Sequence, residues 1–113
     1  MEFLSLESEA KLEEISGAKD PQIIFIHNTT CSISKGVLRS FKDEPDTLPD
    51  SVPFYILDML TYRNISDSIA KKFNVAHQSP QLLLVEDGKC LYTKSLHDIT
   101  PEDTASAISE LKN

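Results

Sequence analysis

The stretch QIIFIHNTTCSIS, residues 22–34, decides the fold of this chain. Consecutive apolar residues near its start predict a strand over Gln22–His27 that is covered on both faces, as central parallel strands are. A polar loop follows, and an apolar stripe at helical spacing then predicts a helix over about residues 32–42. The stripe consists of Ile33, Val37, Leu38 and Phe41. A strand that passes through a short loop into an amphipathic helix is typical of α/β proteins.

The rest of the chain alternates between helices and strands in the same way. Helices are expected over residues 7–16, from a cap at Asn64 to Phe73, and from a cap at Thr100 onward. Strands are expected over Val52–Asp58, Gln81–Glu86 and Lys89–Ser95. The dipeptide Asp87-Gly88 between the last two strands is a strong signal for a hairpin turn.

The resulting order of elements is α-β-α-β-α-β-β-α. A βαβ crossover followed by a hairpin gives a mixed four-stranded sheet with helices on both faces, which is a three-layer α/β/α arrangement. This is the arrangement of thioredoxin-like domains in their compact, glutaredoxin-type form. No repeat, low-complexity tract or linker divides the chain, so we expect a single domain over residues 1–113. Element order alone does not define a function.

The composition argues against several classes of function. Eleven Lys and Arg against eighteen Asp and Glu give a net charge of −7, which disfavours nucleic acids and anionic membranes as partners because both attract basic surfaces. The strongly apolar runs of four residues are too short to span a membrane, and the first residues lack the basic and apolar regions of a signal peptide. Two cysteines are too few for a disulfide framework. We therefore expect a cytoplasmic protein with reduced thiols.

Cys31 is the residue best suited to carry chemistry. It lies between the first predicted strand and the helix, and strand ends in α/β sheets open into the crevice where ligands bind. A thiol at a helix start meets free backbone N–H groups and the positive end of the helix dipole, which favour the thiolate, and Lys35 on the same helix face would add to this effect. The alternative is a small buried apolar residue. Polar neighbours on both sides favour the reactive interpretation.

Ser34 and the Ser79-Pro80 pair indicate how such a thiol would work. Ser34 is located three residues after Cys31, where a dithiol oxidoreductase has its second cysteine. The expected chemistry is therefore monothiol: Cys31 attacks a mixed disulfide, takes up the small thiol and is freed by another thiol. Ser34 is equally suited to local hydrogen bonding at the helix start. Pro80 either only begins a strand or follows a cis peptide bond beside Cys31, which would leave the backbone of Ser79 free to pair with a thiol adduct.

Four segments together resemble the monothiol bacilliredoxin family of the bacillithiol system. They are His27–Ser34, Tyr55–Asp58, Ala76–Gln81 and Asp87–Lys89. The resemblance extends over about residues 22–100 and implies a thioredoxin-like fold and a cytoplasmic setting. It implies that Cys31 is the nucleophile that removes bacillithiol from protein mixed disulfides, and that Pro80 is cis and lies against Cys31.

The expected site surrounds Cys31. Six residues around the thiol are expected to contact the substrate: Thr30, Ser32, Ile33, Ser34, Ser79 and Pro80. The family usually has proline directly after the cysteine, whereas this chain has Ser32, which adds a backbone donor at the helix start. The expected partners are S-thiolated proteins and a low-molecular-weight thiol, bacillithiol or a similar one, as co-substrate. We expect no further cofactor and no metal site.

Cys90 and the histidines are weaker candidates. Cys90 in the last predicted strand is expected to serve packing, because a resolving cysteine would have to come within about 7 Å of Cys31 between Cα atoms. His27 could act as a base or simply end its strand. The spacing of His27, His77 and His97 does not fit a zinc site.

Two other classes of function fit the sequence. A thiol-dependent iron–sulfur carrier would need two chains, each supplying Cys31, and a bound small thiol. A non-catalytic thioredoxin-like binding module would recognise peptides without turnover, and its Cys31→Ser variant would be fully functional.

Overall fold

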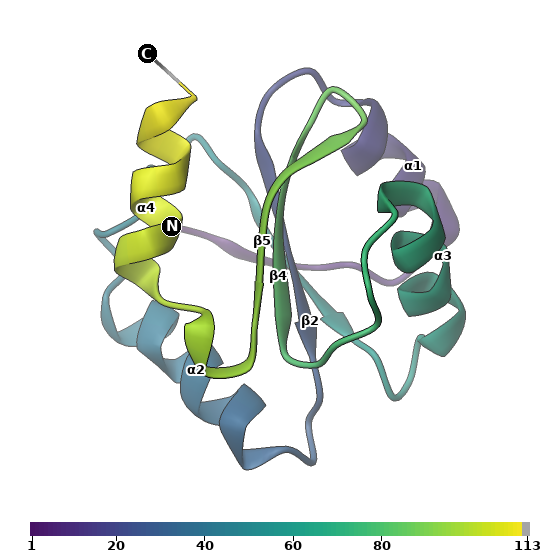
Figure 1. Cartoon of the computed structure of the whole chain (residues 1–113), viewed down its shortest axis with the longest axis horizontal. Coiled ribbons are helices and arrows are strands. Elements are labelled where there is room, and N and C mark those ends of the chain that lie inside the picture. Colours follow the sequence, from purple (N-terminus) through teal and green to yellow (C-terminus); the bar gives the residue numbers. More distant parts are fainter. Residues whose placement is uncertain (112–113) are drawn as a thin grey trace.

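A mixed sheet of five strands forms the middle layer of the computed structural model, which describes residues 1–111 (Figure 1). The strands lie in the order β1-β3-β2-β4-β5. β2 pairs with β3 in parallel and with β4 antiparallel, and β5 pairs antiparallel with β4. Their bounds are β1 Phe3–Ser5, β2 Gln22–His27, β3 Phe54–Asp58, β4 Gln81–Glu86 and β5 Lys89–Ser95.

Within the described residues, four α-helices cover the two faces of the sheet. α2 and α4 lie on one side and α1 and α3 on the other, so the three-layer arrangement expected from the sequence is confirmed (Figure 1). Their bounds are α1 Glu9–Gly17, α2 Ser32–Asp43, α3 Arg63–Phe73 and α4 Pro101–Glu110, and a short 3-10 helix, η1, spans Leu96–Asp98. Among residues 1–111, the helices are too short and too polar to cross a membrane.

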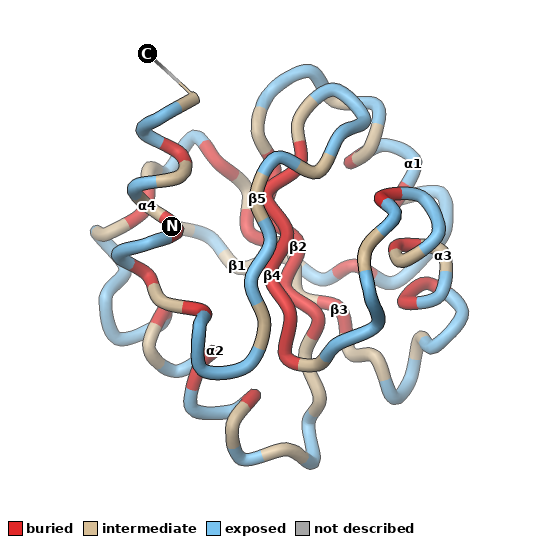
Figure 2. Tube along the Cα trace, in the orientation of Figure 1, coloured by how far each residue is buried: buried red, intermediate tan, exposed pale blue. Residues whose placement is uncertain are grey.

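The central strand β2 supplies both halves of the core. Ile23 and Phe25 face α2 and α4, whereas Ile24 and Ile26 face α1 and α3. All four side chains are buried, and each contributes roughly 1.5–3 kcal/mol by leaving water. Figure 2 shows the resulting buried band along β2 and β4. Because β2 is buried on both faces, its position in the core is fixed. The end of β2, where the loop to α2 begins, is therefore fixed as well.

The fifth strand corrects the expectation of a four-stranded sheet. β1 pairs in parallel with β3 at the sheet edge, with Phe3 opposite Phe54 and their rings 4.9 Å apart in an edge-to-face contact. Leu6, which follows β1, is completely buried. A strand of three residues carries too little periodicity to be predicted from sequence, and its stability comes from pairing with β3 and from packing.

The start of α3 also differs from expectation. Asn64 does not cap the helix, because α3 already begins at Arg63 and Tyr62 occupies the cap position. The side chain of Asp58 accepts hydrogen bonds from the backbone N–H groups of Leu60 and Thr61. With Tyr62 in place of Asn64 at the cap, the helix starts two residues earlier than the sequence signal indicated.

Three loops meet at one end of the sheet. The register places His27 opposite Asp58 and Ile26 opposite Gln81. The loop after β2, the loop after β3 and the segment before β4 therefore share the end at which β2 and β3 finish (Figure 1). Cys31 belongs to the first of these loops.

Candidate functional site

Asn28 organises the loop that carries Cys31. Its side-chain Oδ1 accepts hydrogen bonds from the backbone N–H and the hydroxyl of Thr30, at 3.0 and 2.8 Å. Its backbone carbonyl accepts the N–H of Cys31 at 3.1 Å. An asparagine side chain that bonds two residues ahead stabilises a tight turn, and this turn leads the chain from β2 into α2.

Cys31 is the N-cap residue of α2. Its backbone is extended, with φ −101° and ψ 122°, and its carbonyl accepts the N–H of Lys35 at 3.1 Å. Its side chain is partly exposed and makes no capping hydrogen bond. The first N–H groups of a helix lack partners within the helix and carry its positive dipole end. The structure thus places a reachable thiol where a negative charge is stabilised.

Ser34 connects the start of α2 to the end of β2. Its side chain is completely buried. Its hydroxyl oxygen accepts the backbone N–H of Asn28 at 3.0 Å and lies 2.6 Å from Nδ1 of His27. The hydroxyl therefore has two partners inside the protein and holds the loop in place. In this structure the expected local hydrogen bonding is present, and the hydroxyl faces the protein interior.

His27 sits at the junction of strand and helix. Burial lowers its pKa below the usual range, and the nearby carboxylate of Asp58 opposes this shift without cancelling it. The positive charges of Lys42 and Lys35 lower the pKa further. The ring is therefore neutral at neutral pH and is engaged with Ser34.

Ser79 and Pro80 lie at the same end of the sheet as Cys31. The peptide bond between them is cis, and Pro80 is buried directly before β4. The carbonyl of Pro80 accepts the N–H of Leu96 at 3.0 Å, which ties this segment to η1. Ser79 is partly exposed and lines a hollow beside α3.

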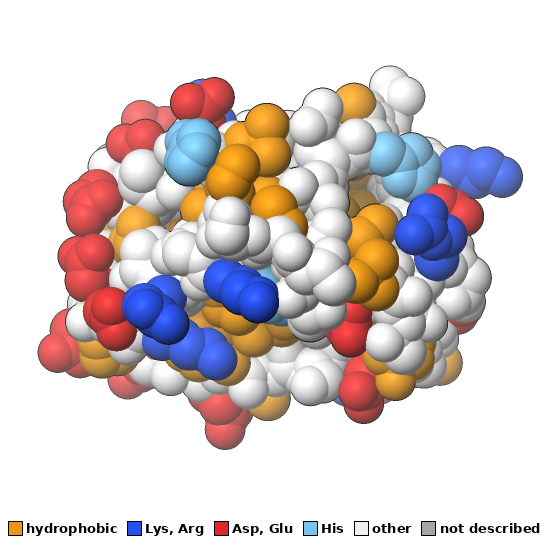
Figure 3. Space-filling model, turned by 90° about the horizontal axis from the view of Figure 1, so that it is seen from below, with side chains coloured by type: hydrophobic (Ala, Val, Ile, Leu, Met, Phe, Trp, Pro, Cys, Tyr) orange, Lys and Arg blue, Asp and Glu red, His pale blue; other side chains and the backbone are white. Residues whose placement is uncertain are grey.

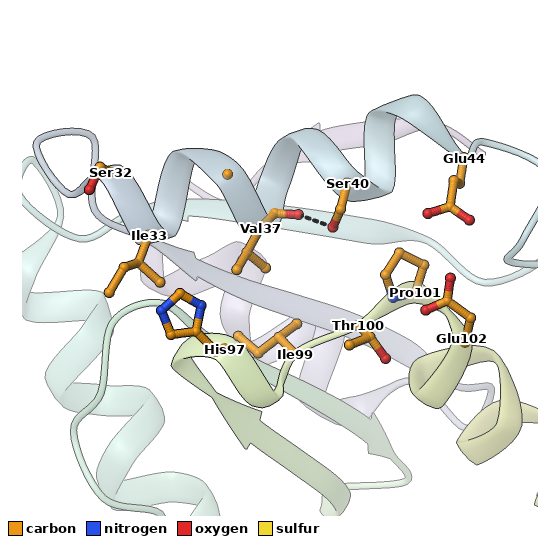
Figure 4. Close-up of a pocket in the computed structure, with 11 residues that line it drawn as sticks. Ser32, Ile33, Val37, Ser40, Glu44, His97, Ile99, Thr100, Pro101 and Glu102 are labelled. Atoms are coloured by element: carbon orange, nitrogen blue, oxygen red, sulfur yellow. Dashed lines mark hydrogen bonds between the residues drawn. The ribbon is translucent and has the colours of Figure 1, made fainter.

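A groove of about 510 Å³ runs between α2 and the segment from η1 to α4 (Figure 4). Ile33 and Val37 point into it from α2, opposite Ile99. Glu44 and Glu102 lie toward its other end. Ser32 also lines this groove, directly after Cys31.

The predicted site residues therefore divide into groups. Ser32 and Ile33 line the groove next to Cys31, and Thr30 is exposed on the loop. Ser34 is buried beneath the loop, and Ser79 opens onto a different hollow. The turn made by Asn28 and the contact between His27 and Ser34 were not predicted from the sequence. An Asn followed by two Thr was the available signal for the turn.

Cys90 lies far from Cys31. It is opposite Val85 in the β4–β5 ladder, and Val85 is opposite Gln22 at the start of β2. Cys31 follows the other end of β2, and a strand of six residues spans about 20 Å. Burial raises the pKa of the Cys90 thiol, whose sulfur lies 3.5 Å from the carbonyl oxygen of Tyr92. The two thiols cannot form a disulfide in this fold.

Within residues 1–111, no group of three or more His, Cys, Asp or Glu side chains could hold a metal ion.

Comparison with known proteins identifies the family. The family described as monothiol bacilliredoxin BrxC matches residues 4–104. A solved structure with a thioredoxin fold is 29% identical, covers 93% of this chain and 92% of that chain, and superposes with a TM-score of 0.81. Thioredoxin from Trypanosoma brucei brucei is 15% identical, with 98% and 91% coverage and a TM-score of 0.79. Thioredoxin from Malassezia sympodialis is 20% identical, with 96% and 90% coverage and a TM-score of 0.78.

These comparisons confirm both the thioredoxin-like fold and the family resemblance seen in the sequence. The two thioredoxins are too distant to show more than the fold. The family match covers most of the chain and includes Cys31 and the Ser79–Pro80 segment. Fold and family together indicate a thiol oxidoreductase of the monothiol type. The chain belongs to the monothiol bacilliredoxin family.

Proposed function

We propose that this protein removes bacillithiol, or a closely similar small thiol, from protein mixed disulfides by thiol–disulfide exchange at Cys31. The observation that carries the proposal is that the partly exposed thiol of Cys31 lies far from the other cysteine, Cys90. Cys31 is the N-cap residue of α2, Ser34 occupies the position of a second cysteine, and Cys90 lies at the opposite end of β2. A thiol without a nearby partner must pass its adduct to another molecule.

The exchange has two steps. In the first, the Cys31 thiolate attacks the small-thiol sulfur of the mixed disulfide, the bond between the two sulfurs breaks, and the protein sulfur leaves as a thiolate that takes a proton from water. Cys31 is then joined to the small thiol by a disulfide. In the second step, the thiolate of another small-thiol molecule attacks the transferred sulfur. This releases the small-molecule disulfide and restores the Cys31 thiolate.

The protein contributes position and charge to these steps. The turn made by Asn28 and the buried hydroxyl of Ser34 fix the loop. The free N–H groups at the start of α2 favour Cys31 as attacking thiolate and as leaving group. Thr30 and Ser32 are exposed beside Cys31 and are assigned to contacts with the substrate.

The remaining predicted contacts are assigned to the two parts of the substrate. Ile33 lines the groove next to the thiol and would contact the thiolated protein. The backbone of Ser79, before Pro80, would pair with the transferred thiol. The proposed setting is the cytoplasm, where thiolated proteins are the partners and the small thiol is the co-substrate.

Intact-mass spectrometry tests the proposal directly. Reduced protein is exposed briefly to a bacillithiol mixed disulfide and, in parallel, to a glutathione mixed disulfide. A single bacillithiol adduct that maps to Cys31 and is released by free bacillithiol supports the proposal. Cys31→Ser should give no adduct, and Cys90→Ala is the matched control that should behave as the wild type.

The other outcomes are equally informative. Transfer from glutathione alone would keep the mechanism and reject bacillithiol as the small thiol. The absence of any adduct on Cys31 would reject thiol–disulfide exchange as the function.

A further inference from the structure

A positively charged hollow lies on the face of α2 that contains Cys31. Its volume is about 380 Å³, and it is lined by His27, Lys35, Leu38, Arg39, Lys42 and Asp43. Its three cationic side chains are exposed, whereas Leu38 is buried beneath them. The hollow thus has an apolar floor and a cationic rim, with Asp43 as the one carboxylate among its lining residues.

The hollow and the thiol share one stripe of the helix. Cys31, Lys35, Leu38 and Lys42 are spaced by four, three and four residues, which places them on the same side of an α-helix. At about 1.5 Å per residue, Lys35 lies about 6 Å and Arg39 about 12 Å from Cys31 along the helix axis. A group of small-molecule length attached to the sulfur can therefore reach the hollow.

The hollow is positively charged, whereas the whole protein has a negative net charge. The chain has a net charge of −7, yet three cations surround this hollow. Figure 3, which views the end of the molecule bearing the Cys31 loop, shows Lys and Arg side chains gathered beside a histidine, with most acidic side chains toward the rim. Lys35 and Lys42 also lower the pKa of His27, which lines the same hollow.

In the part of the chain that the structure describes, no carboxylate forms an ion pair with these cations. Within residues 1–111, neither Lys35 nor Arg39 belongs to an ion pair, and the ammonium of Lys42 lies 5.6 Å from the ring centre of Phe3. Lysines elsewhere on the described surface, such as Lys11 and Lys72, do pair with glutamates. The positive charge of the hollow is therefore available to a ligand.

We propose that this hollow binds a carboxylate group of the small thiol that Cys31 takes up, so that the enzyme selects anionic thiols. The inference rests on the proposed function and adds the chemical class of its co-substrate. A volume of about 380 Å³ suits a small molecule. The groove on the other side of α2 ends between two glutamates and does not offer this charge.

A set of 2-pyridyl disulfides provides the test. The thiolate of Cys31 attacks the alkyl sulfur and releases 2-thiopyridone, whose absorbance gives the rate. The transferred group is anionic (3-mercaptopropionate), neutral (2-mercaptoethanol) or cationic (cysteamine), while the leaving group stays the same. We expect the anionic group to be transferred about tenfold faster than the cationic one at low salt, after correction for the same ratio measured with free cysteine.

Substitutions test whether the cationic side chains of the hollow cause this ratio of transfer rates. The triple substitution Lys35→Gln, Arg39→Gln and Lys42→Gln should bring the ratio close to one. A matched triple at exposed lysines, Lys19→Gln, Lys71→Gln and Lys89→Gln, makes the same change in net charge elsewhere and should keep the wild-type ratio. Salt at 1 M should reduce the ratio, because the screening length falls to about 3 Å. Circular dichroism confirms that both triples are folded.

The outcomes separate this inference from the proposed function. Equal rates for the three disulfides, or a ratio lowered equally by both triples, would overturn the inference while exchange at Cys31 stands. No transfer to Cys31 from any disulfide would overturn the proposed function itself. A further experiment measures the transfer rate of one small thiol from a glutamate-rich peptide and from a lysine-rich peptide. If the rate depended on the charge of the peptide and not on the charge of the small thiol, the hollow would bind the polypeptide, and our inference would be overturned.

Discussion

The hydroxyl oxygen of Ser34 lies 2.6 Å from Nδ1 of His27, although the two residues are seven positions apart in the chain. The same oxygen accepts the backbone N–H of Asn28, two residues before the Thr30–Cys31 step. One buried side chain therefore fixes the end of β2 and the loop that presents Cys31. Ser34, at the position where a dithiol oxidoreductase has its second cysteine, therefore has a structural role.

Removal of this hydroxyl should destabilise the protein. Ser34→Ala leaves the N–H of Asn28 and the ring of His27 without their partner in a buried place. We expect the free energy of unfolding to fall by about 1–3 kcal/mol, measured by urea denaturation. Ser40→Ala is the control, because Ser40 is only partly buried and its hydroxyl bonds to a carbonyl of its own helix. An equal loss in both variants would mean that the loop contact adds nothing.

Ser34→Cys should convert the site to a dithiol. The new sulfur would stand at the third position after Cys31, within the Cα separation that a disulfide requires. After addition of a small-thiol disulfide, we expect the adduct on Cys31 to be lost without external thiol, with an internal disulfide formed in its place. Intact-mass spectrometry follows this as the loss of two hydrogen atoms relative to the fully reduced protein, because the small thiol leaves in its reduced form. The test is made in the Cys90→Ala background, and a persistent adduct there would contradict the expectation.

The pKa of His27 predicts a pH dependence of stability. Burial lowers this pKa in the folded protein, whereas the unfolded chain titrates near the ordinary value of about 6.5. Above pH 6.5 both states are neutral at this residue, so its contribution is constant. As the pH falls from there through the lowered pKa, the unfolded state binds the proton first and the protein loses stability.

Comparison with a His27→Gln variant isolates this contribution. Urea unfolding is measured at several pH values from 7.5 down to 5. As the pH falls, the unfolding free energy of the wild type should decrease more than that of the variant. His97→Gln, at an exposed position, controls for the loss of a histidine as such. A difference that does not change with pH would show that His27 does not titrate as its burial implies.

The central elements could be predicted from sequence because each has a strong local signal. The apolar run of β2 and the Asp87-Gly88 turn between β4 and β5 gave the observed bounds of all three strands. The turn residues both have positive φ, 51° and 79°, as this tight hairpin requires. β1 has no such signal, since its place depends on β3, which is about fifty residues away in the chain.

The candidate site was predictable only in part. The position of Cys31 at a helix start follows from local order, because a strand, a polar loop and an amphipathic stripe occur in sequence. The contact between His27 and Ser34 depends on the turn at Asn28, which brings the two elements together. The cationic hollow needs the same junction, since it combines a strand end with one face of α2.

Cys90 should be dispensable for exchange. It lies at the far end of the sheet from Cys31, and burial raises the pKa of its thiol, which keeps the thiol protonated at neutral pH. Cys90→Ala should retain the wild-type rate of adduct formation and release, and iodoacetamide at pH 7 should label Cys31 first in the wild type. Because its side chain packs against the core beside α1 and α3, the substitution should cost about 1 kcal/mol of stability. Loss of turnover with the fold intact would refute this assignment.

The unexpected edge strand can be tested at Leu6. This side chain is completely buried under α1 and α3, and its N–H donates to the carbonyl of Ile56 in β3 at 2.9 Å. Leu6→Ala should lower the free energy of unfolding by about 2–5 kcal/mol because it opens a cavity in the core. Leu4→Ala, within β1 itself, is the control, since Leu4 is only partly buried, and its cost should be smaller. If urea denaturation gave the same small cost for both, residues 1–6 would not be packed on the sheet, and the domain would depend on four strands after all.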